Sequence, residues 1–415
     1  MKILLSAYAC EPNKGSEPGV GWNWAIELVK LGHEVWVLTR ANNRNVIEAE
    51  LQKAEYSDKL HFIYYDLPDS IMKWKNIKGG IYLYYLLWQW FAFKAVEKIH
   101  IKQQFNLVHH VTFVSIRQPS FMGRLGIPFI FGPVAGGETA PFQLRKSFGI
   151  KGWIVDFARD IANCFIRLDP LMRQTFKSAS FILVTSNQSK KLIPKIFHKK
   201  TKIQLAIGIS SDFKHSNLKI DNKYKSNRIL FIGRFIFWKG LHIGIRAFEK
   251  YSKVNPDATF TIVGEGQEYY KLKKLTDTLN ISHKTIWINW LNQAQLSDIY
   301  SKHDIFLFPS LHDSGGMVVL EAMIHGLPVV CLDIGGPGVI VDGTCGIKIN
   351  TNYKCASQII DELARALFKL SDDKFLYKDL KTGTLNKSEQ YYWPSVVKKV
   401  YENISNNQVG QCESL

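Results

Sequence analysis

The chain has 415 residues, of which 46% are hydrophobic and 21% are charged, and its mean hydropathy is -0.09. These values are typical of globular proteins, and a chain of this length can bury two ordinary cores. Every apolar run is shorter than the roughly 18 to 20 residues that a membrane-spanning helix requires, which argues against an integral membrane protein.

The cysteines indicate the compartment. Six of them are scattered along the chain, without a C-x-x-C pair. Dispersed cysteines predict a reduced, cytoplasmic protein rather than a disulfide-bonded one. The sequence has no D-x-D motif, and its His and Cys residues lack ligand spacing, so we expect no bound metal.

Positive charge is concentrated in the first half of the chain. The formal charge is +17, and residues 1–205 hold 28 Lys and Arg against 15 Asp and Glu. Residues 206–415 hold 25 against 21. The first half is therefore the part that would face an anionic partner, either nucleic acid or an acidic membrane surface. Because no zinc-finger, helix-turn-helix or RNA-recognition motif is present, we expect no nucleic acid.

Short apolar strands alternate with amphipathic helices through both halves, the pattern of parallel sheets covered by helices on both faces. In the first half, strands are predicted at residues 2–8, 34–39, 60–65, 107–110, 127–131 and 180–184. In the second half, they are predicted at residues 228–232, 259–263, 285–289, 305–308 and 329–332. We therefore expect an α/β protein of two Rossmann-like domains, residues 1–210 and 211–391, joined by the Lys-rich segment 211–227.

The first predicted strand is followed by the glycine-rich segment EPNKGSEPGVGWNWA, which opens a helix. We expect Gly15, Gly19 and Gly21 to adopt positive φ and to let the backbone approach a ligand. A dinucleotide site would also need an acid at the end of the second strand, where Thr39 and Arg40 stand instead, so NAD is disfavoured. The alternative is an ordinary glycine turn between strand and helix.

Two further groups follow strands of the first half. His109 and His110 end one strand, and consecutive strand residues face opposite sides of a sheet. We favour His110 as the functional residue and His109 as a core residue. The segment GPVAGGETAP offers Gly136, Gly137 and Glu138, which either position an acceptor or form an ordinary turn.

The second half opens with a strand that delivers Gly233 and Arg234, and Lys239 and Gly240 begin a helix. A lone Arg and Lys pair is usually a solvated surface. Here both cations lie at a strand end or a helix start, where they are well placed to neutralise a diphosphate.

The stretch FPSLHDSGGMVVLEAMIHGLPVV is the most informative part of the sequence. A strand ends, Gly315 and Gly316 follow, and a helix begins, so that backbone amides converge on an anion. Asp313 and Glu321 bracket this turn with seven residues between them. Amides for a phosphate and an acid for a polyol suit a sugar nucleotide.

This spacing resembles the donor-binding motif of family 4 retaining glycosyltransferases, in which an acid, seven residues and a Glu lead into EAM and G-x-PVV. The matching positions are Asp313, Gly316, Glu321, Ala322, Met323, Gly326, Pro328, Val329 and Val330. The chain departs from the family in having Asp313 where Glu is usual. Arg234 and Lys239 match the family's G-R-x(n)-K-G element, and residues 261–266 match its V-G-x-G element.

The resemblance implies a GT-B architecture, with two Rossmann-like domains facing a cleft and a C-terminal helix, residues 392–404, crossing back to the N-terminal domain. It implies a retaining, metal-independent hexosyltransferase of cell-surface polysaccharide synthesis. The donor would be a nucleoside diphosphate sugar, which serves as co-substrate with no other cofactor. The acceptor would be a hydroxyl of a glycan or a lipid-linked molecule.

The expected site residues fall into three groups. The catalytic residues are His110, Arg234, Lys239 and Asp313. The donor-binding residues are Gly19, Gly21, Gly233, Gly264, Gly266, Leu291, Ser314, Gly315, Gly316, Met317 and Glu321. The acceptor-side residues are Gly136, Gly137 and Glu138. Two alternatives stay open: an epimerase-like enzyme that binds the same donor, and a catalytically silent donor-binding subunit.

Aromatic and basic residues are mixed in segments 73–100 and 145–177, a composition that suits the interface of an anionic membrane. The alternative is that both segments are helices packed on the first sheet. Together with the charge of the first half, this composition predicts reversible docking on the inner face of the cytoplasmic membrane.

Overall fold

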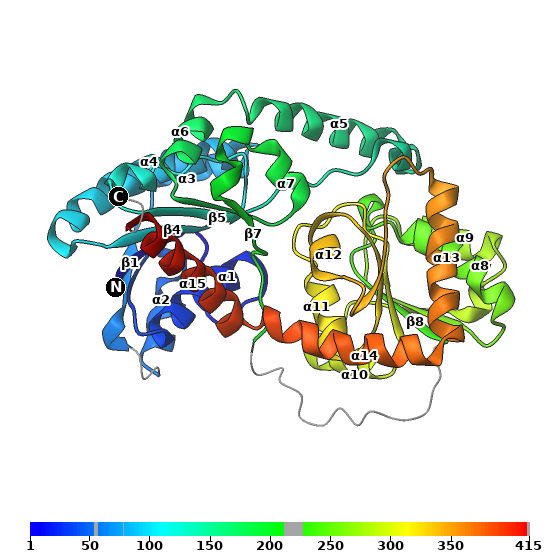
Figure 1. Ribbon diagram of the computed structural model, residues 1–415. Helices are drawn as coiled ribbons and strands as arrows, with labels where there is room; N and C mark the ends of the chain where they lie inside the picture. Colours follow the sequence, from blue (N-terminus) through cyan, green and yellow to red (C-terminus); the bar gives the residue numbers. More distant parts are fainter. Residues whose placement is uncertain (54–56, 78, 211–226, 413–415) are drawn as a thin grey trace. The chain divides into compact units, whose positions relative to one another are not determined.

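A computed structural model describes residues 1–53, 57–77, 79–210 and 227–412 (Figure 1). The chain forms two compact units. The first comprises Met1–Gly137, Ala162–Gly208 and Trp393–Leu415, and the second comprises Glu138–Ile161 and Ile209–Tyr392. Residues 138–161, which the sequence analysis assigned to the first domain, therefore cluster with the second unit. The predicted linker falls, up to residue 226, outside the described residues.

The first unit contains a parallel seven-stranded sheet in the order β3-β2-β1-β4-β5-β6-β7 (Figure 1). Its strands are β1 (Lys2–Ala7), β2 (Glu34–Thr39), β3 (Leu60–Tyr64), β4 (Leu107–Thr112), β5 (Phe129–Val134), β6 (Phe181–Val184) and β7 (Thr201–Ile203). The order reverses between β1 and β4, which is where doubly wound sheets bind ligands.

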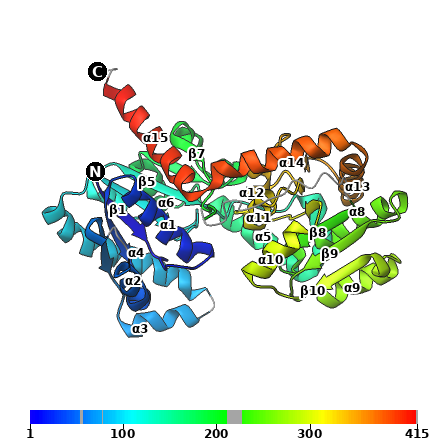
Figure 2. The same cartoon turned by 90° about the horizontal axis from the view of Figure 1, so that it is seen from below.

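The second unit contains a parallel six-stranded sheet in the order β10-β9-β8-β11-β12-β13, of which Figure 2 shows β8, β9 and β10 in succession. Its strands are β8 (Arg228–Ile232), β9 (Thr259–Val263), β10 (Thr285–Ile288), β11 (Ile305–Phe308), β12 (Val329–Leu332) and β13 (Gly346–Ile349). The central strands are continuous apolar runs because both faces of the sheet are covered. Here the order reverses between β8 and β11.

Helices cover both sheets. In the first unit they are α1 (Ser16–Lys30), α2 (Arg44–Leu51), α3 (Asp69–Met72), α4 (Gly80–Gln103), α6 (Pro170–Ser178), α7 (Asn187–Leu192) and α15 (Trp393–Cys412). In the second unit they are α8 (Leu241–Val254), α9 (Tyr269–Thr278), α10 (Gln293–Ser301), α11 (Met317–Ile324), α12 (Gly335–Ile340), α13 (Ala356–Asp372) and α14 (Lys374–Ser388). Helix α5 (Gly149–Phe165) begins in residues of the second unit and ends in residues of the first.

The predicted strands are all present, with small shifts at their ends. Two strands that were not predicted, β7 and β13, lie at sheet edges. Both are short and contain a lysine, Lys202 in TKI and Lys348 in GIKI. Short, charged edge strands prevent pairing with other chains, and they give a weak apolar signal in the sequence.

The C-terminal helix packs in the first unit, as the resemblance implied. Trp393, Val397 and Tyr401 of α15 are buried in the same apolar core as Trp24 of α1. Among the residues that the structure describes, no helix is both long enough and apolar enough to span a membrane.

Buried hydrogen bonds join α15 to β4. The His109 ring lies 2.7 Å through Nε2 from the Gly132 carbonyl oxygen and 3.1 Å through Nδ1 from the Tyr401 hydroxyl. Because a carbonyl only accepts, Nε2 carries the proton and Nδ1 accepts the tyrosine hydroxyl. Burial lowers the pKa of His109 to about 3, although the bond to Gly132 opposes this shift, so the ring is neutral. His109 is thus a satisfied core residue.

We predict that Tyr401→Phe lowers the free energy of unfolding by about 1 to 3 kcal/mol, because it leaves the buried Nδ1 of His109 without a donor. Urea unfolding at pH 7 measures this change. The matched control is Tyr353→Phe, since Tyr353 is 94% exposed and should change stability by less than about 0.5 kcal/mol. Equal stability of the two variants would show that the bond contributes nothing.

Candidate functional site

The loops that follow β8 and β11 meet where the strand order of the second sheet reverses. Lys239, in the loop after β8, forms an ion pair through Nζ with the carboxylate of Asp313, in the loop after β11. Each side chain is 15% exposed. The ammonium group also lies 5.2 Å from the ring centre of Phe308, in cation–π contact. The structure therefore brings together two of the predicted catalytic residues at the expected position.

Asp313 also organises its own loop. Its Oδ1 accepts hydrogen bonds from the backbone amides of Gly315 and Gly316, at 3.0 and 2.8 Å. Burial raises the pKa of Asp313, but the charge of Lys239 and these hydrogen bonds outweigh it and hold the pKa below its usual value. The amides do converge on an anion. That anion is the side chain of Asp313, so the expectation that these two amides serve a phosphate needs correction.

Glycines allow these loops to approach each other closely. Gly240 has φ +66°, and a side chain there would place Cβ 2.0 Å from the Pro309 carbonyl oxygen. Gly335 has φ +59°, and its Cβ would lie 2.0 Å from the Asp313 carbonyl oxygen. The backbone around Asp313 is therefore packed on both sides.

Glu321, the second acid of the motif, lies on the helix that follows the Asp313 loop. It belongs to α11, and its Oε2 accepts a hydrogen bond of 3.0 Å from the hydroxyl of Tyr300 on α10. Burial raises the pKa of Glu321 to about 7, and the bond from Tyr300 opposes the rise. The sequence analysis missed Tyr300, because it lies far from Glu321 in the sequence and no local pattern links them.

The other predicted donor residues also belong to the second unit. Arg234 is exposed, and the amide of Gly233 before it donates to the Val263 carbonyl at 3.0 Å. Leu291 follows β10 and is half-buried, next to the exposed Trp290. Of the remaining members of the group, Gly264 and Gly266 lie in the loop after β9, Ser314 lies in the loop after β11, and Met317 begins α11.

Residues 138–161 contribute to the same site. Glu138 is fully buried, and its Cγ lies 3.3 Å from the position that a Cβ on Gly335 would occupy. It therefore lies at the start of α12, beside the Asp313 carbonyl. Glu138 was expected on the acceptor side of the first domain. The structure places it instead next to the loop after β11 that contains Asp313, called the donor loop below.

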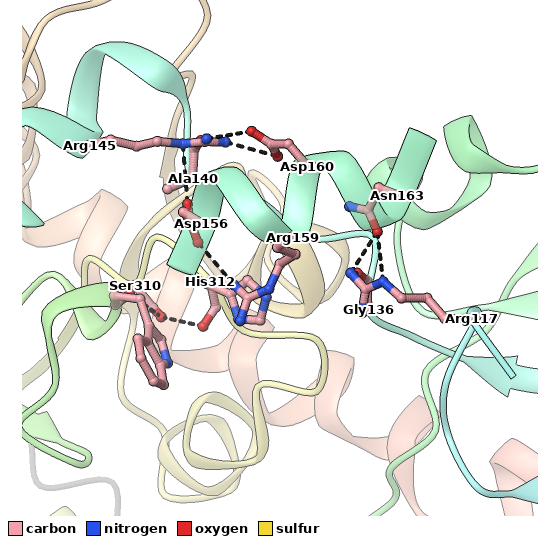
Figure 3. Close-up of polar contacts among 11 residues, drawn as sticks. Arg117, Gly136, Ala140, Arg145, Asp156, Arg159, Asp160, Asn163, Ser310 and His312 are labelled. Carbon is pink, nitrogen blue, oxygen red and sulfur yellow. Dashed lines mark hydrogen bonds and ion pairs between the residues drawn. The ribbon is translucent and has the colours of Figure 1, made fainter. Parts of the chain in front are cut away.

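A buried ion network holds this segment together (Figure 3). Arg145 pairs with Asp156 at 3.2 Å and with Asp160, and its Nε donates to the Ala140 carbonyl at 2.8 Å. Arg159 pairs with the other oxygen of Asp156 at 3.0 Å. Both Arg145 and Asp156 are less than a tenth exposed, and each has a second partner, so the buried charges are paired within the network.

His312 connects this network to the donor loop. Figure 3 shows its imidazole next to the Arg159 guanidinium. Burial lowers the pKa of His312 to about 4, Arg159 and Lys239 lower it further, and Glu138 and Asp313 oppose the shift. Its buried Nε2 has no hydrogen-bond partner among the described residues. A neutral histidine thus stands beside Asp313, and no spacing in the sequence indicated it.

The first unit holds His110 and the predicted acceptor glycines. His110 is 1% exposed and packs against Phe131, and burial lowers its pKa to about 4. The Gly136 carbonyl accepts a bond of 2.6 Å from Arg117, and the Gly137 amide donates to Ser189 at 3.1 Å. The turn is thus held on both sides, and its role toward an acceptor stays a prediction.

The expected positive φ at Gly15, Gly19 and Gly21 is wrong. Gly15 has φ -81°, and Gly19 and Gly21 lie inside α1, while Asn13 and Ser16 adopt φ +57° and +58°. The two helical glycines instead allow close packing. A Cβ on Gly19 would lie 1.9 Å from the carbonyl oxygen of Lys14, and one on Gly21 would lie 2.2 Å from that of Ala9. Their contact with a donor stays a prediction.

Comparison with solved structures identifies the class of fold. The chain is similar to Alr3699/HepE of Anabaena, solved in complex with UDP, with a TM-score of 0.58 and 16% identity, over 98% of this chain and 100% of that one. The two parallel Rossmann-like sheets and this similarity establish the GT-B fold of glycosyltransferases.

Sequence comparison identifies the family. Residues 213–385 match the family described as glycosyl transferases group 1. An uncharacterized glycosyltransferase of Methanocaldococcus jannaschii is 35% identical over 108 residues, 26% of this chain and 27% of that protein. Glycogen synthase of Mycobacterium tuberculosis is 30% identical over 146 residues, 35% of this chain and 34% of that protein. The matches span about a third of these relatives or less. Residues 213–385, most of the second unit, thus match the glycosyl transferases group 1 family, in agreement with the resemblance.

No group of three or more His, Cys, Asp or Glu side chains that could hold a metal ion occurs within the described ranges.

We predict that Asp313→Ala lowers the free energy of unfolding by about 2 to 4 kcal/mol at pH 7, because it leaves Lys239 without its counter-ion and two amides without an acceptor. Because the pKa of Asp313 is lowered in the fold, its contribution is present above the ordinary value of 3.8 and is lost as the pH falls below it. Urea unfolding measures both effects.

Asp298→Ala is the control, since Asp298 pairs with Lys302 on the exposed face of α10. A surface pair of this kind contributes about 1 kcal/mol at most. Equal losses in the two variants would contradict a special role for Asp313.

Proposed function

We propose that the protein is a retaining hexosyltransferase that moves a sugar from a nucleoside diphosphate donor to a hydroxyl of a glycan or lipid-linked acceptor in cell-surface polysaccharide synthesis. The observation that carries the proposal is the meeting of Lys239 and Asp313 where the second sheet reverses its strand order. UDP in the structure of Alr3699/HepE, a protein of similar fold, supports a nucleotide donor.

Stabilisation of the leaving group is the main catalytic task of this site. The bond between the anomeric carbon and the β-phosphate oxygen breaks, and negative charge grows on that oxygen. Lys239 and Arg234 offset this charge, as fixed donors do in oxyanion holes. Since this pair supplies the positive charge, we propose that transfer needs no divalent metal.

Retention follows from attack on the face that the phosphate leaves. The acceptor oxygen bonds to the anomeric carbon, and its proton passes to the departing phosphate oxygen. A double displacement would instead need a carboxylate nucleophile paired with an acid–base carboxylate about 5 Å away. Asp313 is bonded to Lys239 and to two amides, and in this proposal Glu321 binds the ribose rather than the anomeric carbon, so neither carboxylate serves as the nucleophile. Glu321 instead accepts hydroxyl groups of the donor ribose.

We predict that one of UDP, GDP and ADP raises the melting temperature most, because only a nucleotide that binds the native state stabilises it. Arg234→Ala and Lys239→Ala should each raise the barrier to transfer by about 2 to 4 kcal/mol, measured as kcat/KM with the corresponding sugar nucleotide. Activity should persist in EDTA.

Arg246→Ala, an exposed arginine on α8, is the control and should leave kcat/KM unchanged. Donor turnover without acceptor would support the epimerase-like alternative. Nucleotide binding without any turnover would support the silent subunit. A glycosyl adduct trapped on any side chain would contradict the front-face mechanism.

We also propose that the enzyme docks reversibly on the inner face of the cytoplasmic membrane. Helix α5 presents exposed apolar side chains at helical spacing: Ile150, Trp153, Ile154, Phe157 and Ile161. The rings of Trp153 and Phe157 stack at 5.2 Å. An apolar stripe in a strongly basic chain suits an anionic lipid surface.

We predict that replacing Trp153, Ile154 and Phe157 together by Ser weakens binding to vesicles of phosphatidylglycerol and phosphatidylcholine by about tenfold or more, because three apolar side chains no longer enter the lipid. Co-sedimentation measures this binding. Phe375→Ser is the control, since Phe375 is 84% exposed on α14. Absence of wild-type binding at low salt would exclude docking.

A further inference from the structure

We propose that Tyr300 is a positioning residue that fixes the Glu321 carboxylate for the ribose of the donor. This inference rests on the proposed function, in which Glu321 binds that ribose, and it adds a residue to the site.

The Tyr300 hydroxyl has two acceptors within reach. It lies 3.0 Å from Oε2 of Glu321 and 3.3 Å from the Val318 carbonyl oxygen. A hydroxyl donates one proton, and the carboxylate is both the closer and the more strongly charged acceptor. Oε2 is thereby held by the protein, while nothing among the described residues donates to Oε1. Oε1 is the oxygen left for a ligand hydroxyl.

The tyrosine ring is itself fixed in place. Tyr300 is 1% exposed, and its ring stacks on His325 with centroids 5.1 Å apart and an interplanar angle of 19°. His325 lies 2.8 Å through Nδ1 from the Glu321 carbonyl oxygen and 2.8 Å through Nε2 from the Ser297 hydroxyl. Because the carbonyl only accepts, Nδ1 carries the proton and Nε2 accepts from Ser297 in the neutral ring.

The network therefore closes between two helices. Tyr300 and Ser297 come from α10, and Glu321 and His325 come from α11 and its C-terminal cap. The start of α10 is fixed by Asn292, whose side chain and backbone exchange hydrogen bonds of 3.0 Å with Gln295. The carboxylate thus keeps one orientation before a ligand arrives, which lowers the entropy cost of binding.

The hydrogen bond from Tyr300 also affects the pKa of Glu321. Burial raises the pKa of Glu321 to about 7, and the bond from Tyr300 lowers it. Burial, with the charge of Glu321, raises the pKa of Tyr300 well above its usual value, so the phenol stays protonated. The adjoining elements carry further titratable groups: His325 at the end of α11, Asp298 on α10, and, on α14, Lys381, whose side chain approaches Gly326.

The experiment measures UDP affinity by calorimetry from pH 5.5 to pH 9, with GDP and ADP in parallel. Ionised Glu321 accepts two ribose hydroxyls, so wild-type affinity should fall as the pH drops through about 7. Tyr300→Phe removes the bond that favours the ionised form, so the midpoint should rise by about one pH unit. Affinity should then be about tenfold weaker at pH 7, where fewer molecules carry an ionised Glu321, and only about twofold weaker at pH 9, where just the lost orientation of the carboxylate remains.

Two controls separate positioning from packing. Tyr251→Phe, a buried tyrosine of α8 in the same unit, should give the wild-type curve. Glu321→Gln should remove the pH dependence. The proposal is overturned if the Tyr300→Phe curve superimposes on the wild type, or if affinity falls by one factor at every pH. If the wild type binds none of the three nucleotides, the proposed function fails and takes this inference with it. If the wild type binds a nucleotide but the pH midpoint of Tyr300→Phe does not move, only this inference is contradicted.

Discussion

The ion pair between Lys239 and Asp313 is the interaction on which the donor unit depends. A partly buried ammonium group is costly without a counter-ion, and Asp313 supplies one while two amides complete its own hydrogen bonds. The pair therefore orients the ammonium group and offsets the cost of its desolvation.

Contacts around the Asp313 loop also join a distant segment to this unit. The segment 138–161 adds Glu138 beside the Asp313 carbonyl and Arg159 beside His312. These groups surround the donor loop with alternating charges, and the network of Arg145 and Asp156 keeps the segment folded. Its contribution depends on contacts between residues more than 150 positions apart, which no local pattern reveals.

Short sequence patterns predicted the features that depend on neighbouring residues in the chain. Apolar runs located the strands, and the glycine pair with its flanking acids located the donor loop. The failures have common causes. The edge strands β7 and β13 are short and interrupted by a lysine, so they give no continuous apolar run, and Gly19 and Gly21 serve packing against carbonyl groups rather than positive φ. Tyr300 meets Glu321 only after two helices pack, so sequence spacing carries no trace of it.

The two acids of the motif behave differently because of their neighbours. Both are strongly buried, yet the pKa of Asp313 is lowered and that of Glu321 is raised to about 7. Asp313 has a cation and two amides, whereas Glu321 has one phenol. A short aspartate reaches the amides two and three residues ahead, as residues at turns and helix starts do. The aspartate thus holds Lys239 and the loop together, whereas Oε1 of Glu321 receives no hydrogen bond from the described residues.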